Sequence, residues 1–159
     1  MQISRKADYA VRALTYVAAV NGQRTSSINE IAENEKIPRE YLAKILKELT
    51  QKGFLISYKG VNGGYRLAKS REQITFLDVL EATQGPFAVS ACNLEVQDES
   101  ACKGKDKCAV YPFWTDVYNQ LKRILADMNL GKIDYMKYYG SKKQEAHERV
   151  PVGPSGERR

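Results

Sequence analysis

The residues of this chain best suited to chemistry are three cysteines in one polar stretch, SACNLEVQDESACKGKDKC. Nine residues separate Cys92 from Cys102, and five separate Cys102 from Cys108. Three thiols cannot all pair with one another, and in a reducing compartment such a cluster indicates metal or redox chemistry. A tetrahedral metal site would need a fourth ligand from another part of the chain or from a partner.

Three kinds of site fit this cysteine stretch. Iron-sulfur clusters are held by cysteine thiolates, sometimes with another ligand in place of one of them. Structural zinc prefers a closed set of four ligands with cysteine pairs two to four residues apart, and neither spacing here is of that kind. A metal-free thiol switch needs only a reactive cysteine and a resolving one, and neighbouring lysines favour the reactive thiolate. The residues predict a loop and favour a metal only modestly.

The elements ahead of this stretch are predicted to be three helices. Apolar residues recur at helical spacing over residues 4–20, with Ser4 placed to cap the first helix. Ser27 and Glu30 form a capping-box pattern at the start of a second helix. Pro38 stands at the expected first residue of a third helix, which Gly53 ends. This pattern indicates a helix-turn-helix, with a plain three-helix bundle as the alternative.

A β-hairpin is predicted directly after the third helix. The sequence FLISYKGVNGGYRLAK places strands at Phe54–Lys59 and Gly64–Lys69, joined by a glycine-rich turn. A hairpin in this place is typical of the wing of a winged helix. Its tip, flanked by Lys59 and Arg66, would let the backbone approach a phosphate while a cation enters the minor groove.

A long helix is expected after the cysteines, because apolar residues recur every three or four positions from Val110 to Met128. Such a broad stripe can pack against a second copy of the chain. The predicted fold is mainly α with a small β-hairpin. Its four parts are a winged helix-turn-helix DNA-binding domain (1–83), a cysteine-rich cluster-binding loop (84–109), a dimerisation helix with a C-terminal helix (110–139) and a disordered tail (140–159).

Charge and composition narrow the class of function. The net charge is +6, and residues 1–80 hold 13 basic against 8 acidic residues. A basic excess is expected of a protein that binds nucleic acid, although a solvated basic surface has the same composition. The chain has no long apolar run and a charged amino terminus, so we expect a cytoplasmic protein with no membrane contact. It has no phosphate loop, nucleophile elbow or histidine–acid pair, so we expect no enzyme activity.

The chain resembles the Rrf-type winged-helix regulators, a family that includes regulators of iron-sulfur assembly and nitric-oxide-sensing repressors. The resemblance rests, in order, on MQISRKADYAVRAL, PREYLAKILKEL, KGVNGGYRLAK, ITFLDVLEA and the three cysteines, and it covers residues 1 to about 139. It implies a homodimeric transcription factor whose affinity or specificity for DNA changes with the state of an iron-sulfur cluster. Either a 2Fe-2S or a 4Fe-4S cluster fits three thiolates and one further ligand.

The resemblance also suggests the fourth ligand. Some relatives use a histidine three residues after the third cysteine, but this chain has Tyr111 there, and its single histidine, His147, lies in the polar tail. Other relatives use an acidic residue near the amino terminus, supplied by the partner subunit, and Asp8 stands at that position. A carboxylate is a harder donor than a thiolate, so its bond to iron should break more easily. Asp8 could equally stabilise its own helix terminus, and local alternatives are Asp98, Glu99 and Asp106.

We expect a homodimer to bind double-stranded DNA at a pseudo-palindromic operator. The predicted contacts are Arg39, Tyr41 and Lys44 in the third helix. In the wing they are Lys59, Asn62 and Gly63. Some relatives carry a glutamate at the position of Ala43, and this glutamate discriminates between classes of DNA site. Its absence here puts a cluster-dependent switch between site classes in doubt. The alternatives are a metal-free thiol-based repressor of the same fold and an electron-transfer protein; the signal, the operator sequence and the sign of regulation stay open.

Overall fold

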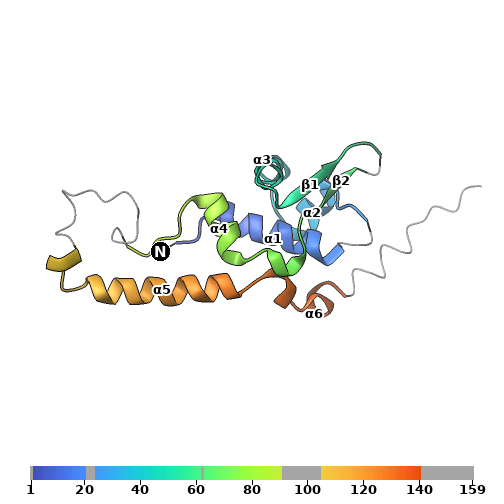
Figure 1. Cartoon of the computed structure of the whole chain (residues 1–159). Helices are drawn as coiled ribbons and strands as arrows, with labels where there is room; N and C mark the ends of the chain where they lie inside the picture. The colour runs from blue at the N-terminus through green and yellow to red at the C-terminus, as the bar shows by residue number, and fades with distance from the viewer. Residues whose placement is uncertain (1, 21–23, 62, 91–104, 141–159) are drawn as a thin grey trace, which may run out of the picture.

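The computed structural model describes residues 2–20, 24–61, 63–90 and 105–140. In chain order the main helices and strands are α1 (Arg5–Val20), α2 (Ile28–Glu35), α3 (Arg39–Gln51), β1 (Leu55–Tyr58), β2 (Gly64–Leu67), α4 (Phe76–Gln84), α5 (Tyr111–Asp127) and α6 (Tyr135–Tyr139). Short 3-10 helices lie at η1 (Arg71–Gln73), η3 (Lys105–Lys107) and η4 (Leu130–Lys132). This mainly helical fold with a single described hairpin confirms the predicted fold class (Figure 1).

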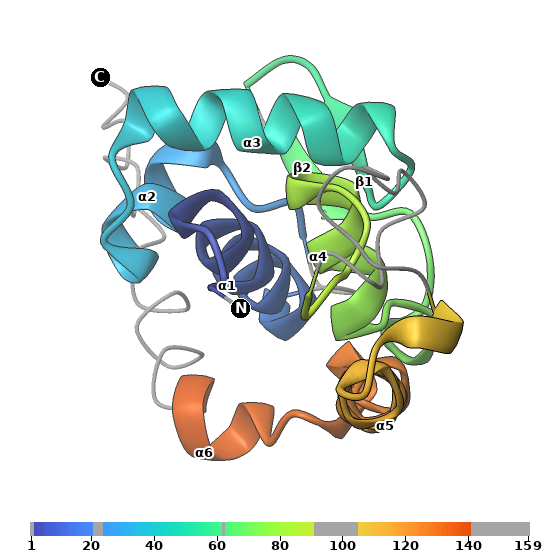
Figure 2. The same ribbon diagram turned by 90° about the vertical axis from the view of Figure 1, so that its left-hand side faces the viewer.

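Helix α1 is the centre of the hydrophobic core. Alanines alternate with larger apolar residues on its inner face, and Ala10, Ala13 and Leu14 are fully buried. The small side chains let neighbouring helices approach closely. Figure 2 looks nearly along α1 and shows α3, α2 and α4 arranged around it. The Ser4 hydroxyl accepts a hydrogen bond from the Ala7 amide at 3.2 Å, which confirms the predicted cap.

Helices α2 and α3 form the helix-turn-helix. The predicted capping box is present: the Ser27 hydroxyl accepts from the Glu30 amide, and the Glu30 carboxylate accepts from the Ser27 amide. The turn passes through Lys36, which has a left-handed φ of 52°. Pro38 was predicted to be the first residue of α3 but is its N-cap, so the helix begins one residue later, at Arg39. The proline ring disfavours helical backbone at the residue before it, so α3 begins here.

The hairpin has the predicted antiparallel form, with Leu55 opposite Leu67 and Tyr58 opposite Gly64. The hairpin is fixed to the start of α2 by a backbone bridge, in which Ser26 and Tyr65 exchange two N–H···O bonds of 3.0 and 2.9 Å. Gly64 lies against this bridge, since a Cβ there would be 2.6 Å from the Ser26 carbonyl oxygen. The wing and the helix-turn-helix therefore form one body.

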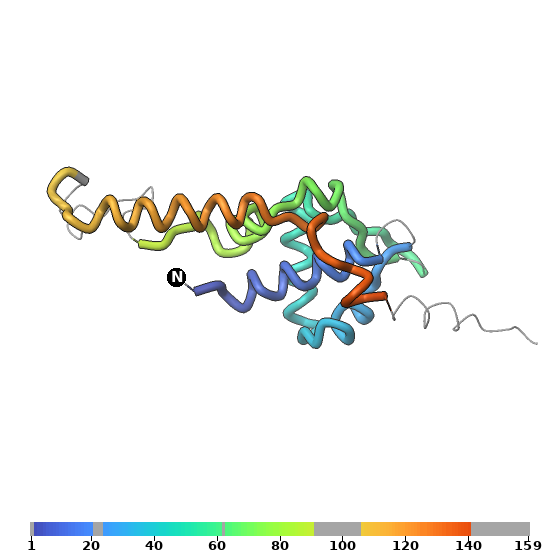
Figure 3. Tube along the Cα trace, turned by 90° about the horizontal axis from the view of Figure 1, so that it is seen from below, coloured from blue at the N-terminus to red at the C-terminus, as the bar shows by residue number. Residues whose placement is uncertain are grey.

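Helix α5 extends away from the rest of the chain. Its carboxyl end lies beside the body formed by α1 to α4 and the hairpin, and its amino end, with η3, reaches well past the start of α1 (Figures 1 and 3). Helix α4 packs against it, and the rings of Phe87 and Tyr118 stack 5.8 Å apart. No α5 side chain in the described structure is buried. None of the described helices is long and apolar enough to cross a membrane.

After α5 the chain returns to the core. The Phe76 amide donates to the Met128 carbonyl at 2.8 Å, and the Leu130 amide donates to the Ile74 carbonyl at 3.0 Å. Leu130 is buried, and Tyr135 and Tyr139 of α6 pack against the core cluster. The sequence predicted a C-terminal helix but not this packing. The predicted disordered tail lies outside the described residues, apart from Gly140.

Candidate functional site

The outer face of α3 carries the predicted basic contacts. Leu42, Ile45, Leu46 and Leu49 are buried, and Arg39 and Lys44 are exposed. Arg39 lies on the flank facing α2, where its Nε donates to the Asn29 Oδ1 at 2.7 Å. This bond orients the guanidinium beside the start of α2. Two cations on the exposed surface of a recognition helix are suited to base edges or phosphates.

Tyr41 lies on the opposite flank of α3, toward α1. Its side chain is 38% exposed, and its ring meets the ring of Tyr9 edge-on at a centroid distance of 5.8 Å. On the same flank Lys6 donates to Glu48 at 2.9 Å, and this bond holds the pKa of Glu48 below its ordinary value. The aromatic pair and the ion pair fix the rotation of α3 against α1.

The wing presents its tip to solvent. Lys59 and Val61 are exposed, and Asn62 lies outside the described residues. The turn itself requires a glycine at position 63, because a Cβ there would lie 2.6 Å from the Tyr58 carbonyl oxygen and 2.8 Å from that of Gly60. Its amide closes the turn onto Gly60 at 2.9 Å. The glycine is therefore needed for the hairpin whether or not it touches DNA.

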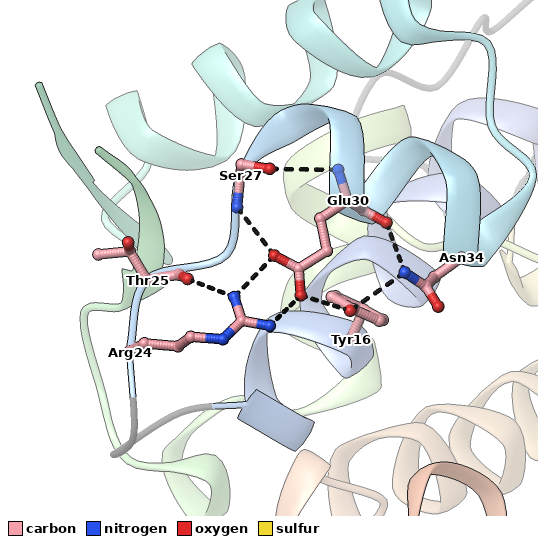
Figure 4. A network of polar contacts seen from close by, with 6 residues as sticks. All are labelled: Tyr16, Arg24, Thr25, Ser27, Glu30 and Asn34. Atoms are coloured by element: carbon pink, nitrogen blue, oxygen red, sulfur yellow. Dashed lines mark hydrogen bonds and ion pairs between the residues drawn. The ribbon is translucent and has the colours of Figure 1, made fainter. Parts of the chain in front are cut away.

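A polar network fixes the start of α2 (Figure 4). The Glu30 carboxylate accepts from the Arg24 guanidinium, with one bond of 2.7 Å, and from the Tyr16 hydroxyl at 2.7 Å. Asn34 Nδ2 donates to the Tyr16 hydroxyl at 3.2 Å. Burial opposes ionisation of Glu30, but the bonds from Arg24 and Tyr16 outweigh it and hold its pKa below its ordinary value. The charged carboxylate thus joins α1, the segment before α2 and α2 itself.

Asp8 lies in the first turn of α1 with its carboxylate available to solvent. Its side chain is 55% exposed, and its one ion pair in the described structure is to Arg12 at 3.6 Å. Arg12 is also bound to Glu35, both at the carboxylate at 3.5 Å and at the backbone carbonyl. A carboxylate held by one loose surface contact can turn to another partner at small cost.

Of the three cysteines, Cys108 lies within the described residues, whereas Cys92 and Cys102 do not. Cys108 is partly exposed and follows η3, and its carbonyl accepts from the Tyr111 amide at the start of α5. Figures 1 and 3 show that this end of α5 is well separated from the first turn of α1 in the same chain. Among the described residues, no three potential metal ligands gather at one point. Asp106, a local alternative ligand, is exposed on η3.

Three residues that the sequence did not indicate orient the predicted contacts. Tyr9 supports Tyr41, Asn29 supports Arg39, and Arg12 pairs with Asp8. Arg12 could have been found, since it stands four residues after Asp8 on the same helix face. The other two contacts join separate helices, and a single sequence carries no signal for them.

Comparison with known proteins agrees with this architecture. The profile of the Rrf2 family, described as iron-dependent transcriptional regulator, matches residues 3–134. A protein of Aquifex aeolicus named as an HTH-type transcriptional regulator is 34% identical over 114 residues, covering 72% of this chain and 78% of the relative. The HTH-type transcriptional regulator IscR of Cronobacter sakazakii is 29% identical over 133 residues, covering 84% of this chain and 80% of IscR.

A solved structure has the same fold. CymR, the global cysteine regulator of B. subtilis, aligns with a TM-score of 0.69 at 24% sequence identity, covering 87% of this chain and 98% of CymR. The helix-turn-helix, the wing and the long helix after them therefore follow a known arrangement. With the family profile spanning all of these elements, the chain belongs to the Rrf2 family of winged-helix transcriptional regulators.

Proposed function

We propose that this Rrf2-family regulator is a homodimer that binds a pseudo-palindromic DNA operator and senses redox state, nitric oxide or iron-sulfur supply through an iron-sulfur cluster. The single observation that carries the proposal is that the first turn of α1, which holds the exposed Asp8, is well separated from the amino end of α5, which the partly exposed Cys108 closely precedes. A site that uses both residues needs two chains. Iron-sulfur ligation by three thiolates and a fourth donor matches this residue set.

Helix α5 supports the homodimer. Phe113, Ile124 and Val110 are 61%, 58% and 55% exposed, although each is apolar. Exposed apolar side chains along one helix can be buried against a partner. Members of the Rrf2 family bind DNA and typically function as dimers. A second copy whose α5 packed antiparallel to this one would bring its own amino terminus toward the amino end of this helix.

In the proposed site, Cys92, Cys102 and Cys108 of one subunit and Asp8 of the other hold the cluster. A bound cluster supplies a centre that reacts with oxidants and nitric oxide. The chain provides ligands of unequal strength, because the carboxylate is a harder and more weakly bound donor to iron than the thiolates. Asp8 also belongs to the helix that packs on α3, so ligation at this residue acts close to the recognition helix.

The proposed DNA surface comprises Arg39, Tyr41 and Lys44 of α3 and Lys59, Asn62 and Gly63 of the wing. Two such surfaces related by a two-fold axis would meet half-sites about one helical turn apart, or a multiple of it. We keep the division into a DNA-binding domain (1–83), a cluster-binding loop (84–109), a dimerisation and C-terminal segment (110–139) and a tail (140–159) as part of this proposal.

The test is anaerobic purification followed by a visible spectrum, iron and sulfide assays, and DNA binding at fixed salt. We expect a coloured protein containing iron and sulfide, whose affinity for a selected duplex changes when a chelator removes the iron. A Cys108→Ser variant should lose the colour and keep its helical circular dichroism. Equal DNA affinity of cluster-loaded and stripped protein would contradict sensing through a cluster.

A metal-free thiol switch is the second candidate. Cys108 is partly exposed and directly follows Lys107, a setting in which a thiol can be oxidised without a metal. This candidate predicts a colourless, iron-free protein whose DNA affinity changes with peroxide and returns with a thiol reductant. The same purification therefore separates the two candidates.

A further inference from the structure

The turn of the helix-turn-helix contains a buried carboxylate. Glu35 is the last residue of α2, is 9% exposed, and immediately precedes Lys36 with its left-handed backbone. A charge with so little access to water is costly unless other groups compensate it. The groups bound to Glu35 therefore influence how α2 turns into α3.

Two groups from distant parts of the chain bind Glu35. Arg12 of α1 reaches its carboxylate and its carbonyl, and Tyr139 of α6 donates its hydroxyl to the Glu35 Oε1 at 3.1 Å. Tyr139 stands 104 residues after Glu35 in sequence. Burial and the neighbouring negative charge of Glu35 both raise the pKa of Tyr139. The phenol is therefore a hydrogen-bond donor throughout the physiological range.

The ring of Tyr139 is also held by contacts with other side chains. It meets the ring of Tyr16 edge-on at 6.0 Å and lies 6.2 Å from the ring of Tyr135. Tyr135 donates to the Leu130 carbonyl at 2.8 Å, and the guanidinium of Arg71 lies 4.5 Å over its ring. Helix α6 is short, and these contacts rather than its own length fix its position.

The segment between Met128 and Tyr139 connects α5 to this turn. At its start, backbone hydrogen bonds join Met128 and Leu130 to the residues just before α4 and at its beginning. At its end, Tyr139 binds Glu35. The twelve residues from Met128 to Tyr139 thus link the end of the exposed helix α5 to the end of α2, just before the turn into the recognition helix α3.

We propose that Tyr139 is a positioning residue for DNA recognition, which fixes the helix-turn-helix relative to α5 through its hydrogen bond to Glu35. In a dimer joined through α5, this bond helps to set the separation and tilt of the two recognition helices. It therefore contributes to the preference for one half-site spacing. This inference rests on the proposed DNA-binding dimer and adds a residue outside the predicted DNA surface.

The experiment compares the wild-type chain with Tyr139→Phe, which removes only the hydroxyl. The neighbouring Tyr138, which is exposed, supplies the matched control Tyr138→Phe. The probes are a duplex selected from a random pool by the wild-type protein and two copies of it with the spacer between half-sites changed by one base pair. Fluorescence anisotropy at fixed salt gives the ratio of affinities for the correct and altered spacers.

We expect Tyr139→Phe to lower this ratio roughly 10-fold, the lower end of the range for one hydrogen bond to a charged acceptor, because Arg12 still binds Glu35. Tyr138→Phe should leave the ratio unchanged. Amide exchange at Ile37, whose N–H donates to the Ala32 carbonyl across the turn at 3.0 Å, should be faster in Tyr139→Phe alone. If Tyr139→Phe does not fold, Tyr139→His, which keeps a ring donor, takes its place and should give a smaller decrease.

The outcomes separate the two proposals. A wild-type ratio retained in Tyr139→Phe, even with a lower melting temperature, would mean that Tyr139 only stabilises the fold, and would overturn this inference alone. A wild-type protein that selects no duplex would overturn the proposed function and this inference with it. A lower ratio together with faster exchange at Ile37 supports the positioning role.

Discussion

Replacing Asp8 by alanine should destabilise a bound cluster while leaving the cluster-free protein nearly as stable as before. The structure limits the second effect, because the Asp8–Arg12 pair spans 3.6 Å between side chains that are 55% and 36% exposed. Such a surface pair contributes at most about 1 kcal/mol to the free energy of unfolding. A carboxylate in the first turn of a helix adds a similar amount through the helix dipole, about 0.3–1 kcal/mol.

Loss of a cluster ligand should weaken the binding of the cluster far more than loss of the surface ion pair weakens the fold. We expect anaerobically purified Asp8→Ala to contain less iron than wild type, to release it faster to a chelator, and to have a shifted visible spectrum. Asp8→Cys should instead release iron more slowly than wild type, since a thiolate binds iron more strongly than a carboxylate. Thermal unfolding of the stripped proteins should differ by only a few degrees.

The matched control is Glu33→Ala, which removes an exposed carboxylate from α2. It should change neither iron content nor the rate of iron release. Asp8→Ala with a wild-type spectrum and wild-type iron release would refute the reasoning, and the search for the fourth ligand would return to Asp98, Glu99, Asp106 or a non-protein ligand.

Four further single substitutions should each change a measurable property of the protein. Gly64→Ala should lower the free energy of unfolding by about 2–3 kcal/mol in chemical denaturation, because its Cβ would meet the Ser26 carbonyl oxygen at 2.6 Å. The pKa of Glu30 is lowered in the folded state, so its contribution to stability is present above the ordinary pKa of 4.5 and is lost as the pH falls through the folded value. The melting temperature should therefore fall less steeply between pH 7 and pH 3 for Glu30→Gln than for wild type. Ile124→Asp, at an exposed apolar position on α5, should shift sedimentation toward the monomer. Lys59→Ala should reduce the slope of log affinity against log salt by about 0.9, if this lysine contacts one phosphate.

Local signals predicted the DNA-binding half of the fold well. Ser4 and Ser27 cap helices because each hydroxyl accepts a hydrogen bond from the amide three residues ahead, and this chemistry depends only on neighbours in sequence. The hairpin followed in the same way from alternating strand residues around a glycine turn. The apolar residues of α5 predicted a helix with more apolar surface than its own chain covers, and their exposure agrees with that interpretation.

The contacts that orient these elements could not be predicted. Tyr139 reaches Glu35 across 104 residues, and Arg39 reaches Asn29 from another helix. Such pairs depend on how the helices pack, which one sequence does not specify residue by residue. The predicted ligand set is also divided in space, because the first turn of α1, with Asp8, lies apart from the amino end of α5, which Cys108 closely precedes. Spacing along the sequence does not indicate this separation, whereas the family resemblance, which supplies the acidic ligand from the partner subunit, does.

The shape of α5 has a mechanical consequence. Its carboxyl end is anchored by the backbone hydrogen bonds of Met128 and Leu130, and its amino end adjoins Cys108. With 17 residues at 1.5 Å each, the helix is about 25 Å long. A tilt of about 10° at the anchored end would move the Cys108 end by about 4 Å, more than the length of any metal–ligand bond. A change in the proposed cluster at this end would therefore act on the body of the protein both through the anchored end of the helix and through α4, which packs against it.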